Sequence, residues 1–164
     1  MALQAAARGA SITRLALFEP AYVSDGGQPR TYEAVNARLD QLLAAGDRAG
    51  AVRFVLTEVM GVPRPFAFVM PLFMRNTWKK NEAVAHTLKY DLTLLSDWSV
   101  LQQRHPTVPT LAIGGEKSPQ SLREAVAMVA AAIQGAHTQI LAGQNHNLAP
   151  TALTPVVNKF FLGN

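Results

Sequence analysis

Short apolar runs lie toward both ends of the chain. Three of them, at about 12–18, 108–113 and 138–141, have the length and composition of buried strands. Helical periodicity follows the second and third runs, so strand and helix alternate in the last third of the chain. Because such alternation favours parallel strands joined by right-handed crossovers, the pattern predicts an α/β fold with a three-stranded, mostly parallel sheet.

The middle of the chain has a helical period instead. Apolar residues recur at helical spacing from residue 31 to residue 45, again up to Gly61, and a third time over 81–96. Residues 63–78 are rich in Pro, Phe and Met, which suits either an adaptable apolar surface or core packing. The pattern predicts a helical, cap-like insertion over 21–98, within one partial domain that spans 1–164.

Turn chemistry sets the remaining boundaries. Ser24–Pro29 has the composition of a loop. Ser118 and Pro119 are typical of an N-cap and a first helical position, so a helix is expected from there to Gly135. A last helix is expected over about 150–161.

Composition narrows the classes of function. The chain has 164 residues, of which 49% are hydrophobic and 16% charged, so it is long and apolar enough for one folded domain. The absence of cysteine excludes disulfides, a thiolate metal site and a cysteine nucleophile. The net charge of +4 comes from scattered basic residues, which argues against nucleic-acid binding. No apolar run reaches the roughly 20 residues of a membrane span, so we expect a cytoplasmic protein without a membrane partner.

Candidate catalytic residues follow the predicted strands. Glu19 follows the first strand, Glu116 and Ser118 the second, and His146 the third. Ligands and catalytic groups of parallel α/β sheets gather beyond the carboxyl ends of the strands. A histidine with one acid could therefore form the base and the orienting carboxylate of a nucleophilic triad.

The order of these stretches resembles the C-terminal half of a bacterial α/β-hydrolase-fold protein with a helical cap. The stretches that carry the resemblance are Leu15–Pro20, His86–Asp91, Val108–Pro119, Gly143–His146 and Phe160–Phe161. The resemblance implies an ester-type serine hydrolase that acts on a small acyl substrate, with His146 as base and Glu116 or Glu19 as acid. It implies no cofactor and no metal.

Two departures from the family pattern limit this interpretation. The family's nucleophile lies in a Gly-x-Ser-x-Gly turn, and this chain contains no such motif. The opening Ala-rich helix corresponds to the helix after that turn, so we expect the nucleophile to precede residue 1 and the chain to be truncated. In addition, Ser118 stands where the family usually has its aspartate, which leaves Glu116 and Glu19 as alternative acids.

Structural interpretations stay open beside the catalytic ones. His146 could be an ordinary loop histidine, Glu116 a solvated turn residue, and Glu19 a residue that binds loop backbone. Ser118 fits an N-cap better than a nucleophile.

Two functions therefore remain. The chain is either a weakly active or inactive ester-type hydrolase, or a non-catalytic α/β module. In the second case the first strand would present an unpaired apolar edge, so we expect a homodimer or a partner chain to cover it.

Overall fold

The structure of the protein is a computed structural model that describes residues 1–22, 24–25, 28–29, 32–102 and 105–163. It divides into two compact units. One unit comprises Met1–Arg30 and Asp97–Asn164 and contains the main sheet, and the other is the helical segment Thr31–Ser96.

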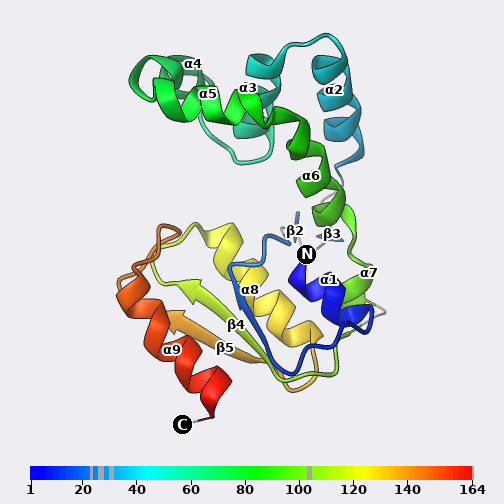
Figure 1. Ribbon diagram of the computed structural model, residues 1–164, viewed down its shortest axis with the longest axis vertical. Helices are drawn as coiled ribbons and strands as arrows, with labels where there is room; N and C mark the ends of the chain where they lie inside the picture. The colour runs from blue at the N-terminus through cyan, green and yellow to red at the C-terminus, as the bar shows by residue number, and fades with distance from the viewer. Residues whose placement is uncertain (23, 26–27, 30–31, 103–104, 164) are drawn as a thin grey trace. The chain divides into compact units, whose positions relative to one another are not determined.

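The main sheet has three parallel strands in the order β1-β4-β5. β1 spans Leu15–Phe18, β4 spans Thr110–Gly115 and β5 spans His137–Leu141. The central strand β4 is buried along its whole length, as expected for a strand with a neighbour on each side and helices on both faces. The register pairs Phe18 with Ile113 and Gly115 with Leu141, so all three strands end at the same edge of the sheet (Figure 1).

Alternate side chains of β1 point to opposite faces of the sheet, and each face has its own core. Leu15 and Leu17 pack in a cluster with residues of α1 (Ala2–Ala7), α7 (Ser99–Gln102) and α8 (Gln120–Ala132). Ala16 and Phe18 pack in another cluster with residues of α9 (Pro150–Leu162). The sheet is therefore the middle layer of three, with α8 on one face and α9 on the other (Figure 1).

The helical unit has cores of its own. Its helices are α2 (Glu33–Ala44), α3 (Arg48–Glu58), α4 (Arg64–Phe73), α5 (Arg75–Ala83) and α6 (Leu88–Ser96), with a 3-10 turn at Ala85–Thr87. Leu39 and Leu92 are almost fully buried in one cluster, and Trp78 lies in a second. The first turn of α3 is held by Asp47, whose Oδ1 accepts a hydrogen bond of 2.8 Å from the Gly50 amide.

The predicted fold class is confirmed, because the three expected strands form one parallel sheet. The segment 81–96 is helical as predicted but interrupted: α5 ends at Ala83, and Thr87 closes a 3-10 turn by donating from both its amide and its hydroxyl to the Val84 carbonyl. The predicted loop Ser24–Pro29 contains two short antiparallel strands, β2 (Ser24–Asp25) and β3 (Gln28–Pro29).

The buried centre of the sheet leads to a stability prediction. Ile113 of β4 is 1% exposed, so Ile113→Ala should lower the free energy of unfolding by about 2–5 kcal/mol through lost burial and a residual cavity. The same substitution at Ile140 of β5, which is 43% exposed, should cost about 1 kcal/mol or less. Urea unfolding followed by circular dichroism measures both variants, and equal losses would contradict the placement of Ile113 in the core.

Candidate active site

Glu19 begins the site at the carboxyl end of β1. Its amide donates to the Ile113 carbonyl at 2.8 Å, which continues the pairing of β1 with β4 by one residue. Its φ is +42°, the left-handed region that residues other than glycine rarely adopt and that costs on the order of 1–3 kcal/mol. This backbone turn carries a side chain that is only 1% exposed.

Both carboxylate oxygens of Glu19 have hydrogen-bond partners. Oε1 accepts from the Gly115 amide at 3.1 Å and also from the Ser118 hydroxyl. Oε2 lies 2.6 Å from Nδ1 of His146. The buried charge is therefore compensated by donors from the end of β4, from the turn that follows it, and from the histidine loop.

His146 lies in the loop after β5, and its side chain is 63% exposed. Its ring stacks on that of Phe18, with centroids 6.4 Å apart and planes 22° from parallel. Backbone bonds join the loop to the turn after β4: the Lys117 amide donates to the Gln144 carbonyl at 2.8 Å, and the Glu116 amide donates to the Leu141 carbonyl at 3.1 Å. The imidazole is thus held on one side and open to solvent on the other.

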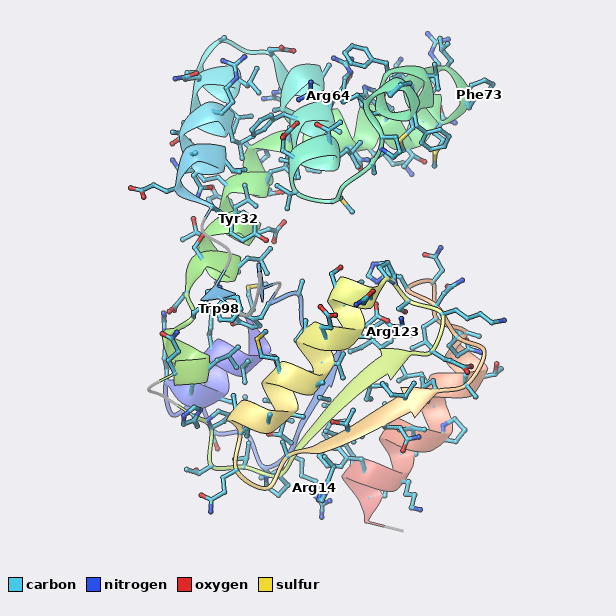
Figure 2. All side chains as sticks on the ribbon, turned by 180° about the vertical axis from the view of Figure 1, so that it is seen from behind. Arg14, Tyr32, Arg64, Phe73, Trp98 and Arg123 are labelled. Carbon is cyan, nitrogen blue, oxygen red and sulfur yellow. The ribbon has the colours of Figure 1, made fainter. Side chains whose placement is uncertain are left out.

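The Glu116 carboxylate also binds this loop, but at a backbone amide rather than at the imidazole of His146. Its Oε2 accepts from the Gly143 amide at 2.7 Å, and its carbonyl accepts from Arg123 of α8 at 3.1 Å. Figure 2 labels Arg123 on α8. Glu116 therefore closes the start of the loop, whereas the carboxylate that reaches the imidazole belongs to Glu19.

Opposing influences act on the pKa of Glu19. Burial raises the pKa, while the hydrogen bonds from Ser118, His146 and Gly115 and the charge of His146 lower it, and the net pKa is lowered. Glu19 is therefore a carboxylate near neutral pH, and a carboxylate only accepts hydrogen bonds. The proton of the 2.6 Å contact consequently belongs to Nδ1, so Nε2 is the ring nitrogen left to exchange a proton with another group.

The structure brings three of the residues singled out in the sequence together: Glu19, Ser118 and His146. The expectation that Ser118 caps a helix is wrong, because α8 begins at Gln120 with Pro119 at its N-cap and no side-chain cap, while the Ser118 hydroxyl donates to Glu19. Sequence reasoning missed Gly115 as a donor. The Gly114–Gly115 pair in the sequence marks this position. Glycine is required at 115 because a Cβ there would lie 2.7 Å from the Gln144 carbonyl oxygen.

The described residues hold neither a metal-type cluster nor a spanning helix. Among them, no group of three or more histidines and acids is placed to bind a metal ion. None of the helices that the structure describes is long and apolar enough to cross a membrane.

Comparison with known proteins gives a likeness to a solved structure. No protein-family model and no curated protein matches the chain. A solved structure does match: an α/β hydrolase from Sphaerobacter thermophilus DSM 20745, 38% identical, with a TM-score of 0.79 over 97% of this chain. The chain has a partial α/β-hydrolase fold. The chain spans 62% of the length of that structure, and the likeness supports a hydrolase-like lineage.

The lowered pKa of Glu19 predicts how stability depends on pH. A carboxyl group whose pKa is lower in the folded chain stabilises the fold above its unfolded pKa, near 4.5, and this contribution is lost as pH falls through the folded pKa. Glu19→Gln should therefore flatten the fall in unfolding free energy below about pH 5, measured by urea unfolding across a pH series. An unchanged pH dependence in Glu19→Gln would contradict the lowered pKa.

Proposed function

We propose that this chain, which has a partial α/β-hydrolase fold, carries the base and the orienting carboxylate of an ester-type hydrolase site. His146 is the general base, and Glu19 is the carboxylate that orients it. The observation that supports this assignment is the 2.6 Å contact between Glu19 Oε2 and His146 Nδ1, with the other oxygen of Glu19 bound by Gly115 and Ser118.

In the proposed chemistry, Nε2 of His146 takes a proton from the nucleophile as it attacks the acyl carbon, whose carbonyl π bond opens to an oxyanion. The imidazolium then gives this proton to the leaving alkoxide as the carbonyl re-forms and the ester C–O bond breaks. The imidazolium that forms is stabilised by the ionised carboxylate of Glu19 behind it. Glu116 is the less favoured acid, because its carboxylate accepts the Gly143 amide hydrogen. Its proposed part is to hold the loop on which His146 lies.

The nucleophile is not assigned to any residue of this chain. No Gly-x-Ser-x-Gly motif occurs in the 164 residues, and the hydroxyl of Ser118 is buried and donates to Glu19. Because the positioned nucleophile and the oxyanion hole supply much of the rate in acyl transfer, we expect the chain alone to be weakly active or inactive. The proposed substrate is a small carboxylic ester.

The helical unit is proposed to serve as the cap of the same hydrolase. Its helix α4 carries large apolar side chains that are unusually exposed, among them Phe66 at 60% and Phe73 at 83%. Exposed apolar surface of this kind often marks a binding surface. The cap role predicted for 21–98 stays a prediction, and the compact helical unit Thr31–Ser96 lies within that range.

Turnover of p-nitrophenyl acetate tests the role of His146. His146→Ala should lower the turnover by about 100-fold, the lower end of what a general base contributes. His137→Ala is the matched control, because His137 is an exposed histidine at the opposite end of β5 and should leave the rate unchanged. Turnover that falls in His146→Ala but not in His137→Ala would support the proposed base, and equal rates in both variants would favour the non-catalytic alternative.

That alternative is a non-catalytic α/β module that pairs through β1. It is favoured by one observation: β1 is at the edge of the sheet order β1-β4-β5, and within the described residues β4 is its ladder partner. Apolar edge strands tend to pair with another chain.

Light scattering coupled to size exclusion tests this alternative at micromolar concentration. A module that pairs through β1 should elute as a dimer, and Ala16→Pro should shift it to monomer because proline removes a backbone donor from the edge strand. Ala142→Pro, outside the strands, is the control for the proline itself. A monodisperse monomer of the unaltered chain would exclude pairing under these conditions.

A further inference from the structure

We infer that Ser118 is a positioning residue that fixes the Glu19 carboxylate so that Oε2 meets His146. This inference rests on the proposed function for its catalytic meaning, but the geometry behind it is independent of turnover. The Ser118 hydroxyl donates to Oε1, the oxygen that does not face the imidazole.

The first step is the division of donors between the two oxygens. Oε1 receives two donors, the Gly115 amide and the Ser118 hydroxyl. Both lone pairs of Oε1 are then engaged, which leaves Oε2 for Nδ1 of His146. The hydroxyl thereby selects both the rotation of the carboxylate and the oxygen that the histidine meets.

The second step is the way the chain places the hydroxyl. The turn after β4 brings Ser118 back over the strand end, where its amide donates to the Gly115 carbonyl at 3.2 Å. A Cβ on residue 115 would lie 2.7 Å from the Ser118 Oγ, so the hydroxyl occupies space that only glycine leaves open. Ser118 is 4% exposed, so water has little access to take the place of its hydroxyl.

The third step separates this role from ordinary helix capping. The N-cap of α8 is Pro119, and no side chain caps the first turn of that helix. The donor of Ser118 is therefore directed to the site rather than to the helix. Loss of the hydroxyl should therefore alter the hydrogen bond between Glu19 and the His146 imidazole and leave the start of α8 unchanged.

Nuclear magnetic resonance of the full chain tests the inference directly. In the unaltered protein the Nδ1 proton of His146 should be protected from exchange with water. Ser118→Ala should accelerate this exchange roughly tenfold, because a hydrogen bond to a charged group is lost. The titration midpoint of the Glu19 carboxyl carbon should rise in the same variant. Ser118→Thr keeps the hydroxyl and should restore most of the protection.

The control removes another buried hydroxyl, at the opposite end of β4 from the site. Thr110 of β4 is 1% exposed and donates to the Val108 carbonyl at 2.9 Å, so Thr110→Val should affect stability but leave the Nδ1 proton of His146 unchanged. Equal exchange of this proton in Ser118→Ala and the unaltered chain would overturn the inference, as would equal acceleration in Thr110→Val.

Two further measurements cover the remaining cases. If Ser118→Ala does not fold, the hydroxyl proton of Ser118 in the unaltered chain decides the matter: slow exchange supports the inference, and rapid exchange overturns it. If Ser118→Ala alters the Nδ1 proton while ester turnover does not depend on His146, the positioning role stands and the proposed function fails.

Discussion

Burial of the Glu19 carboxylate is the constraint on which the arrangement of the site depends. The Glu19 side chain is 1% exposed, and a charged group that is buried to this extent is tolerated only when hydrogen-bond donors replace the water it has lost. Those donors are the Gly115 amide, the Ser118 hydroxyl and the His146 ring, which lie on separate segments of the chain. The carboxylate therefore holds the end of β4, the following turn and the histidine loop at one place.

The sheet makes this convergence possible. Parallel pairing of β1 with β4 and of β4 with β5 brings the carboxyl ends of three strands to one edge. Two local features adapt the backbone there: Glu19 takes a φ of +42°, and Gly115 leaves room for the Gln144 carbonyl and the Ser118 hydroxyl. The buried strand β4 supplies the rigid base against which these close approaches are held.

Hydrophobic pattern was enough to predict the sheet, because strand length, burial and alternation with helices are local properties of the sequence. The same rule placed Glu19, Glu116 and His146 at one edge, but it could not choose between the two acids. That choice depends on side-chain rotamers and burial, which are set by tertiary packing. The Glu116 carboxylate accepts from the Gly143 amide, whereas the buried Glu19 carboxylate lies against Nδ1 of His146. The role of Ser118 was hidden for a similar reason, since a serine before a proline is locally the pattern of a helix cap.

Glu19 is buried and His146 is exposed, and this difference favours a catalytic reason for their contact over a purely structural one. A turn needs no buried charge, and an apolar residue at position 19 would avoid both desolvation and the need for three donors. A left-handed φ at a residue with a Cβ adds a further cost that a glycine would avoid. This arrangement provides an imidazole whose Nδ1 is held by the Glu19 carboxylate and whose side chain is 63% exposed. A fixed carboxylate beside an accessible imidazole is what the proposed role of His146 as general base requires.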